Sequence, residues 1–329
     1  MSKNNSQYYK DLSNNKLSLE TINTITPLFE KYNLTLKELD KKDKQLLTEP
    51  VITDKLTKLK LYVCLGNKSW EGLVVGFPGT DKDLNSRNMT TPYIRHILYP
   101  MLDLQKRLRD YHNKAMPCIY IIGERFDDVF LRKIRLLNIR TSHLIILTGD
   151  LYRCIKTQTE LPNKGKVNTE SAMKYRLCYE SKNKNLIIPA GKENGIDFRY
   201  ICNELPAYQG TEKPERLDIL GYNNDPKDKS LIAFELKKPD TKDRVDLENL
   251  FFQGLEHLNW LEENKMAVKF MFEGPRGNKI NTKKRVKLVL GYGGENTPQL
   301  FKDFRIAMKK DPYQEIVFYD LNNFDKNNY

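Results

Sequence analysis

Three residues with acidic and basic side chains lie on two apolar segments of this 329-residue chain. Asp218 lies in Glu215–Leu220, and Glu235 and Lys237 follow in Phe234–Lys238. Both segments have the composition of strands, along which side chains alternate between the two faces. Glu235 and Lys237 are therefore expected to share one face. The opposite face takes the apolar side chains of the same strand: Ile232, Phe234 and Leu236.

Charged side chains are unusual on so apolar a strand, because burying a charge is costly unless it is paired or holds a metal. Two carboxylates and a lysine that meet at one point can bind a hard divalent cation and serve phosphodiester chemistry. The alternative is that Glu235 and Lys237 form an exposed cross-strand pair on an edge strand. The apolar character of the strand favours the buried site.

The elements around these residues alternate between strands and helices in the second half of the chain. A helix is expected near 168–181, with Asn168 as its cap, and a second helix at about 244–263. The other expected elements are strands at 199–205, 216–221, 230–237, 267–272 and 286–291, a helix at 298–309 and a strand at 315–320. This order indicates an α/β domain with a mixed sheet.

The first half is predicted to form a separate α/β domain. Residues 1–60 are expected to form polar helical pieces, with helix starts at Ser18-x-x-Thr21 and, as a capping box, at Thr35-x-x-Glu38. Strands are expected at 60–65, 71–76, 118–122 and 143–148, and helices at 93–112 and about 127–138. The polar stretch 155–169 is the predicted linker, so the predicted domains are 1–154 and 165–329.

One pattern occurs twice along the chain. Cys118–Leu151 and Val286–Leu321 both give a strand, a glycine, a helix and a strand, and each follows a long helix that carries a glutamine, Gln105 or Gln253. Any two βαβ units look alike in this way, which is one interpretation. The other is a degenerate duplicate, in which the first half lacks the Asp…Glu-x-Lys set and is a non-catalytic partner.

Composition limits the class of protein. The formal net charge of +12 is spread over both halves and favours a polyanionic partner such as nucleic acid, although a generally lysine-rich composition gives the same excess. The five cysteines show no CxxC spacing, so a zinc site or disulfide framework is not expected and a reducing cytoplasm fits. The sequence contains no run of about 18 apolar residues, so no membrane span is predicted. The N-terminal residues do not resemble a signal peptide.

The Asp218…Glu235-x-Lys237 arrangement resembles the PD-(D/E)XK phosphodiesterase superfamily, which includes many restriction and repair nucleases. The resemblance covers about residues 165–290, and Leu217 stands where the family's name-giving proline would be. The segment Gln253-Gly-Leu-Glu-His257 is similar to the Gln-xxx-Tyr motif of RecB-like members, with histidine in place of tyrosine. The two strand segments also look like the branched-DNA and mismatch endonucleases of the NucS type.

The resemblance implies a restriction-endonuclease-like mixed sheet flanked by helices. Asp218, Glu235 and the carbonyl of Leu236 would bind Mg²⁺, for which Mn²⁺ would substitute. Lys237 would orient or deprotonate the attacking water, or neutralise charge that develops on the phosphate; a lysine, unlike an arginine, can adapt its pKa to this task. Gln253 would hydrogen-bond the lysine, the water or a phosphate.

A third acidic metal ligand often comes from the preceding helix in this family. Glu170 is the first candidate, with Glu180 and Glu204 as the others. Glu170 could equally be an acidic residue that stabilises the first turn of its helix. Glu215 neighbours Asp218 but is expected to point away from it by strand parity.

A basic loop at 274–285 follows the helix that carries Gln253. Its cationic side chains could clamp a phosphate backbone, with Lys238 joining them from just beyond the motif. The alternative is an ordinary solvent-exposed hairpin. The predicted nucleic-acid-binding residues of the loop are Arg276, Lys279, Lys283, Lys284 and Arg285.

These features together predict a Mg²⁺-dependent endonuclease that acts on DNA in the cytoplasm, in restriction or antiviral defence, and forms a homodimer. The first half would serve recognition, dimerisation or regulation. Two other functions stay open: a repair enzyme or RNase that acts on branched or single-stranded substrates, and a nucleic-acid-binding protein that does not cleave. No membrane partner is predicted. The sequence also contains no nucleotide-binding fingerprint, since no Gly-Lys-Ser/Thr follows the turn at Gly76–Thr80.

Overall fold

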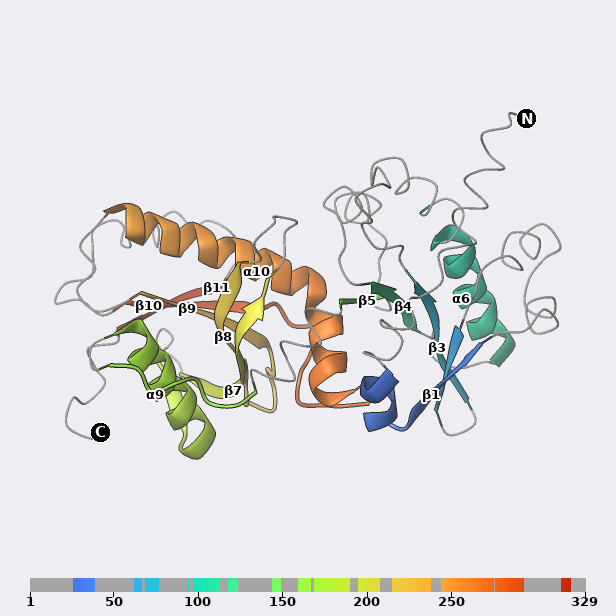
Figure 1. Cartoon of the computed structure of the whole chain (residues 1–329), viewed down its shortest axis with the longest axis horizontal. Helices are drawn as coiled ribbons and strands as arrows, with labels where there is room; N and C mark the ends of the chain where they lie inside the picture. Colours follow the sequence, from blue (N-terminus) through green and yellow to red (C-terminus); the bar gives the residue numbers. More distant parts are fainter. Residues whose placement is uncertain are drawn as a thin grey trace, which may run out of the picture. The chain divides into compact units, whose positions relative to one another are not determined.

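The protein, seen here as a computed structural model, divides into two compact units, Met1–Tyr152 and Arg153–Tyr329 (Figure 1). The residues that the structure describes are 26–38, 62–66, 69–76, 94, 98–112, 118–123, 144–148, 159–166, 169–189, 195–207, 215–237, 244–274, 276–292 and 315–320. Each unit is built on its own mixed sheet.

The first unit contains a five-stranded sheet in the order β1-β2-β3-β4-β5. Its strands are β1 (Leu34–Glu38), β2 (Tyr62–Gly66), β3 (Ser69–Gly76), β4 (Cys118–Gly123) and β5 (Leu144–Thr148). The first three strands pair antiparallel, and β4 and β5 run parallel to β3. Parallel neighbours need a crossover connection, and helix α6 (Tyr99–His112) lies between β3 and β4 in sequence.

The second unit contains a six-stranded sheet in the order β11-β10-β9-β8-β7-β6. Its strands are β6 (Leu186–Ile188), β7 (Ile196–Pro206), β8 (Arg216–Asn223), β9 (Leu231–Lys237), β10 (Lys287–Tyr292) and β11 (Glu315–Asp320). Strands β6 to β9 pair antiparallel, and β10 and β11 run parallel to β9. The prediction of an α/β domain with a mixed sheet is confirmed.

Two helices cover opposite faces of this second sheet, α9 (Glu170–Asn183) and α10 (Arg244–Glu273), as Figure 1 shows. The alternation along β10 explains how they divide the sheet. Val289 belongs to the apolar cluster that includes residues of α9, whereas Leu288 and Leu290 contact Gly254 of α10. A Cβ atom at Gly254 would lie 2.9 Å from Leu290 Cδ2, so this glycine allows α10 to pack closely on the sheet.

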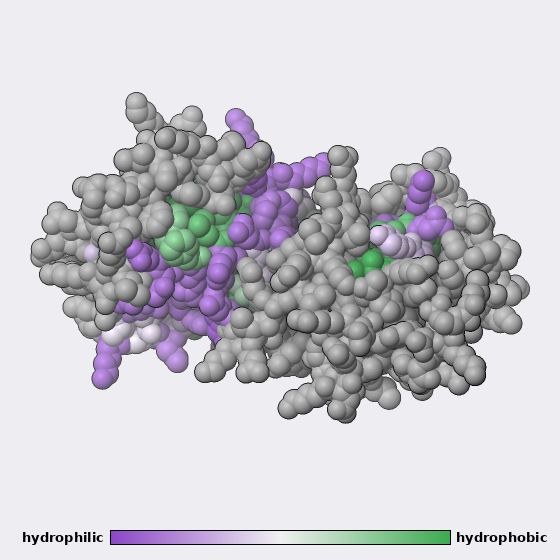
Figure 2. Space-filling model, turned by 90° about the horizontal axis from the view of Figure 1, so that it is seen from above, coloured by the Kyte–Doolittle hydropathy of each residue, from purple (hydrophilic) through white to green (hydrophobic). Residues whose placement is uncertain are grey.

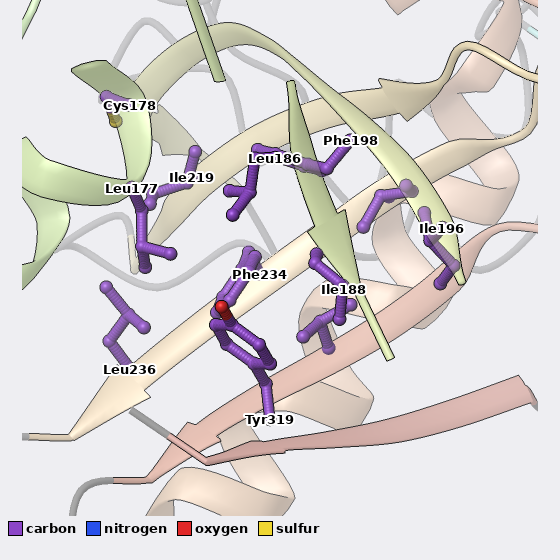
Figure 3. Close-up of a cluster of buried hydrophobic side chains, with 12 residues drawn as sticks. Leu177, Cys178, Leu186, Ile188, Ile196, Phe198, Ile219, Phe234, Leu236 and Tyr319 are labelled. Atoms are coloured by element: carbon purple, nitrogen blue, oxygen red, sulfur yellow. The ribbon is translucent and has the colours of Figure 1, made fainter. Parts of the chain in front are cut away.

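The core between α9 and the sheet centres on aromatic rings (Figure 3). Phe234 of β9 packs edge-to-face against Phe198 of β7 at a centroid distance of 5.8 Å and against Tyr319 of β11 at 6.0 Å. Ile232, Phe234 and Leu236 all belong to this cluster, so the predicted apolar face of the motif strand is confirmed. The remaining side chains of the strand must then point toward α10.

Helix α9 begins one residue later than the sequence predicted. The side chain of Thr169 accepts a hydrogen bond from the backbone N–H of Ala172 at 3.2 Å, which makes Thr169 the N-cap. The predicted cap, Asn168, lies outside the described residues.

The predicted strand at 267–272 is wrong, because α10 continues unbroken to Glu273. Ala267, Val268, Phe270 and Met271 are all buried, at spacings that suit one wide face of a helix. A short apolar run fits a strand and a buried helix equally well, and here the helix that precedes it simply propagates.

The predicted capping box at Thr35-x-x-Glu38 is also wrong. These residues lie in β1, whose backbone pairs with β2 from Leu34↔Gly66 to Glu38↔Tyr62. A helix does form just before it, at 26–31, where Phe29 packs against Tyr120 with ring centroids 5.3 Å apart. The predicted helix start at Ser18 and the predicted helices at 127–138 and 298–309 lie outside the described residues.

The two sheets share one plan over five strands. The order and directions of β1-β2-β3-β4-β5 match those of β7-β8-β9-β10-β11, and α6 and α10 occupy corresponding places in the connection between parallel strands. The repeat is therefore longer than the βαβ pattern visible in the sequence. It agrees with a duplicated fold, and that interpretation stays a hypothesis.

Most of the described surface of the second unit in Figure 2 is hydrophilic, with a smaller apolar area among the polar side chains. None of the helices in the described ranges is both long enough and apolar enough to cross a membrane.

Candidate functional site

The candidate site lies where strands β8 and β9 separate. Their pairing runs from Tyr222↔Leu231 to Ile219↔Phe234, and the next residues are Asp218 and Glu235. Asp218 Oδ2 instead accepts a hydrogen bond from the backbone N–H of Leu236, at 2.8 Å. A side-chain carboxylate thus accepts the backbone N–H that a carbonyl of the neighbouring strand would otherwise accept.

Both carboxyl groups are withdrawn from water, since Asp218 is 9% exposed and Glu235 is 2% exposed. Strand β9 lies inside the sheet between β8 and β10, so the alternative of an exposed pair on an edge strand is wrong. Burial raises the pKa of Glu235 well above its usual value, and the negative charge of Asp218 raises it further. Two buried acids this close favour either a shared proton or a cation.

Helix α9 contributes Lys174, which was not predicted from the sequence. Its Nζ lies 2.6 Å from Asp218 Oδ1, and it also forms an ion pair with Glu204. Burial acts to lower the pKa of Lys174, but the attraction of Asp218 and then Glu204 outweighs it, so the pKa is raised. One signal in the sequence points to it: Lys174 lies on the same buried stripe of the helix as Leu177, Cys178 and Ser181.

Glu204 comes from β7 in an unusual backbone conformation. It lies between the pairs Asn203↔Ile219 and Leu205↔Leu217, and therefore next to Asp218, with φ at +51°. The left-handed region costs a non-glycine residue about 1–2 kcal/mol, and such strain is often found at functional sites. The strained residue holds a carboxylate against Lys174.

The three candidates for a third acidic ligand therefore differ. Glu204 is in contact with the cluster through Lys174. Glu170 is near it: burial raises its pKa, Asp218 raises it further, and the positive charge of Lys237 opposes the shift. Glu180 lies ten residues, or about 15 Å, farther along α9, where it faces Lys184 at 3.9 Å.

Helix α10 contributes His257 from the other face of the sheet. The ring is 1% exposed, and its Nδ1 is hydrogen-bonded to Glu235 Oε1. Burial lowers the pKa of His257 to about 4, with Asp218 opposing the shift, so the ring is neutral near pH 7. One proton joins the two groups: either Nδ1–H donates to an ionised Glu235, or the protonated carboxyl group of Glu235 donates to Nδ1.

Glu215, which was expected to point away from Asp218, has its Oε2 3.9 Å from His257 Nε2. It precedes the first residue of β8, Arg216, so strand parity does not fix the direction of its side chain. Gln253 is half-buried and stands one turn before His257 on the same face of α10. Lys237 is half-exposed at the last position of β9.

The basic loop lies at the other end of the strands. The backbone N–H of Asn281 donates to the carbonyl of Lys229 at 2.8 Å, in the turn between β8 and β9. The loop leads into β10, whose first residue, Lys287, pairs with Ile232 of β9. Glu235 lies three residues farther along β9, about 10 Å from that pair. The described cations of the loop are exposed: Arg276, Lys279, Lys283, Lys284 and Arg285. Lys238 lies outside the described residues.

The donor chemistry of the cluster fits a hard divalent cation, because its carboxylates offer oxygen and repel one another. Within the described residues, no group of three or more Asp, Glu, His or Cys side chains is already arranged around a metal position. Lys174 instead neutralises part of the charge.

No family model, curated protein or solved structure matches this chain. Its function is therefore inferred from its own residues and from the resemblance of its motif.

Proposed function

We propose that the second unit is a metal-dependent phosphodiesterase that acts as an endonuclease. One observation carries the proposal: the carboxyl groups of Asp218 and Glu235 are buried side by side where β8 and β9 separate, and Lys237 follows two residues later. Buried acids that repel each other raise the free energy of the metal-free protein, and a divalent cation relieves that repulsion.

Each residue has a role that its position supports. Asp218, Glu235 and the carbonyl of Leu236 would hold Mg²⁺ or Mn²⁺, with Glu170 or Glu204 as a further acidic group. The bound metal would supply positive charge that activates water and stabilises the phosphate. Lys237, half-exposed at the last position of β9, would orient or deprotonate the attacking water or balance charge on the phosphate.

His257 and Gln253 would act from α10. His257 holds Oε1 of Glu235 and so fixes the orientation of that carboxylate. Gln253, one turn earlier, would bond the lysine, the water or a phosphate.

The fold and the charge support the choice of substrate. A mixed sheet with helices on both faces agrees with the restriction-endonuclease-like resemblance. The net charge of +12 and the exposed basic loop suit a polyanion. DNA is the proposed substrate by resemblance, and a cytoplasmic homodimer in restriction or antiviral defence is the proposed setting.

A second candidate is a nucleic-acid-binding protein that does not cleave. It is favoured by the ion pair of Lys174 with Asp218, which neutralises a charge that a metal site would need. Both candidates bind nucleic acid, and only cleavage distinguishes them.

The test is incubation of the purified protein with double-stranded DNA, single-stranded DNA and RNA, each with Mg²⁺, Mn²⁺ or EDTA. We expect cleavage that needs the metal and is lost in Glu235→Ala and in Lys237→Ala, while both variants remain folded. Unchanged cleavage in either variant would refute the site. Binding without cleavage under every metal condition would favour the second candidate.

A further inference from the structure

We propose that Lys174 is a built-in cation that stabilises the site without metal and competes with the divalent cation for Asp218. It is a positioning residue that sets the metal affinity of the site. The inference rests on the proposed function, because it concerns the same metal site.

The position of Lys174 is the first argument. It is 8% exposed, on the stripe of α9 that packs against the sheet, where an apolar residue would be expected. A buried lysine is costly unless it is paired, and this one is paired twice, with Asp218 and with Glu204. The ammonium thus offsets negative charge that the site carries in excess.

The use of the Asp218 oxygens is the second argument. Oδ2 accepts the Leu236 N–H at 2.8 Å, and Oδ1 lies 2.6 Å from the Lys174 ammonium. A divalent cation at its usual short distance from Oδ1 would lie close to that ammonium and be repelled by it. The two cations therefore cannot both lie close to Oδ1.

Lys174 can keep Glu204 as its partner when a metal displaces it from Asp218. The side chain of Glu204 is 34% exposed, whereas that of Asp218 is 13% exposed, so the second partner of Lys174 lies toward solvent. The flexible four-carbon stem of a lysine can move its charge over such a short distance. The left-handed backbone at Glu204 keeps that carboxylate beside the lysine.

Competition has two linked consequences. If Lys174 stabilises the metal-free state, its removal must lower the stability of the metal-free protein. The same removal must raise the affinity for the metal, because the metal no longer displaces an ammonium. A lysine with a merely structural role would change the stability alone.

The chain offers a matched control. Lys287 Nζ also lies 2.6 Å from a carboxylate, Asp228 Oδ2, and both side chains are largely buried. Lys287→Met therefore removes a similar ion pair from the same sheet, at the end that is away from Asp218.

The experiment compares the full chain with Lys174→Met and Lys287→Met. Thermal unfolding in EDTA and calorimetric titration with Mn²⁺ and Mg²⁺ are measured for each. We expect both variants to melt earlier than the wild type in EDTA. Only Lys174→Met should bind the metals more tightly, by roughly tenfold or more.

Equal or weaker metal affinity in Lys174→Met would refute the competition, while metal-dependent cleavage by the wild type would leave the proposed function standing. A wild type that binds neither metal would refute the metal site itself. If Lys174→Met does not fold, Lys174→Arg provides the test. A guanidinium can bind both carboxylates and is harder to displace, so metal affinity should fall; tighter binding would refute the proposal.

Discussion

Two lysine–aspartate pairs hold opposite ends of β8 and β9 in the second unit. Lys174 and Asp218 are 2.6 Å apart at one end, and Lys287 and Asp228 are 2.6 Å apart at the other. All four side chains are largely buried. By distance and burial the two pairs are nearly equivalent, yet only one of them is proposed to do chemistry.

The surroundings of the two aspartates make the difference. Asp228 also accepts a hydrogen bond from Asn223 at 2.8 Å, so one carboxylate is matched by one ammonium and one amide. Asp218 shares its lysine with Glu204 and lies beside Glu235, so the carboxylates outnumber the ammonium. A balanced pair stabilises a fold, whereas a surplus of buried carboxyl groups must be neutralised by a proton or a cation.

The largest expected effect is on the rate of cleavage, for which variants at the two ends of the strands should differ. Asp218→Asn and Glu235→Gln each keep the shape of the side chain but remove a charge that the metal needs. Cleavage in Mg²⁺ should fall by roughly 10²–10³-fold or more. Asp228→Asn makes the same chemical change at the balanced pair and should leave the rate nearly unchanged. Equal losses in all three variants, measured on protein that is still folded, would mean that the two aspartates do not differ in function.

Sequence alone was enough to predict the motif strands, because the signal is local. Alternation along β9 places Glu235 opposite the apolar side chains of Phe234 and Leu236, and the structure has these two in the core. The end of the β8–β9 pairing at Ile219↔Phe234 was not predictable, because it depends on how two strands diverge in three dimensions.

Lys174 and Glu204 were missed or ranked low for a different reason. Their ion pair joins residues thirty positions apart, and it depends on the rotation of α9 and on one left-handed residue in β7. Neither is a property of a short segment. The strand predicted at 267–272 was wrong for the opposite reason. The local pattern is apolar enough for a strand or a buried helix, and the segment is helical because α10 continues through it.

The second prediction asks whether the Asp228 end of the strands also contacts the substrate. The basic loop is fixed to α10, since Glu273 accepts the backbone N–H groups of Lys279 and Ile280 and Glu262 accepts that of Val286. Its exposed cations are thus held on a stable surface.

Charge reversal of Lys283, Lys284 and Arg285 should weaken DNA binding and reduce the dependence of log Kd on log salt. The slope should fall by about 0.9 for each phosphate that the variant no longer neutralises, or about 3 for all three. Binding is measured between low and moderate salt, with Asp228→Asn as the control for the nearby turn. An unchanged slope would mean that this end of the strands does not touch the backbone of the nucleic acid.

The third prediction concerns His257, which contacts Glu235 at the Asp218 end of the strands. His257→Phe preserves the buried ring but leaves Glu235 without this partner. The free energy of unfolding in EDTA should fall by about 1–3 kcal/mol, the usual cost of an unsatisfied buried polar group. His257→Gln keeps an N–H donor and should recover part of the loss. If the two variants were equally stable, His257 would be acting through packing alone.

The smallest effect is a dependence on pH that has opposite signs at the two ends. Burial acts to raise the pKa of Asp228, but hydrogen bonds from Lys287 and Asn223 outweigh it and hold the pKa below its usual 3.8. Asp228 therefore contributes stability above that pH and loses it as the pH falls through the folded value. The pKa of Glu235 is raised above its usual 4.5 by burial and by Asp218. Its contribution is present below 4.5 and is lost as the pH rises through the folded value.

Denaturant unfolding in EDTA between acid and neutral pH tests both signs. The stability of the wild type minus that of Asp228→Asn should increase as the pH rises from the acid side, by less than about 1 kcal/mol, because the Asp228–Lys287 pair keeps some exposure to solvent. The wild type minus Glu235→Gln should instead decrease as the pH rises above 4.5. Differences of the same sign would mean that the Asp218 end carries no surplus of negative charge. The physical distinction between the two pairs would then be lost, and with it the reason to expect a metal at only one of them.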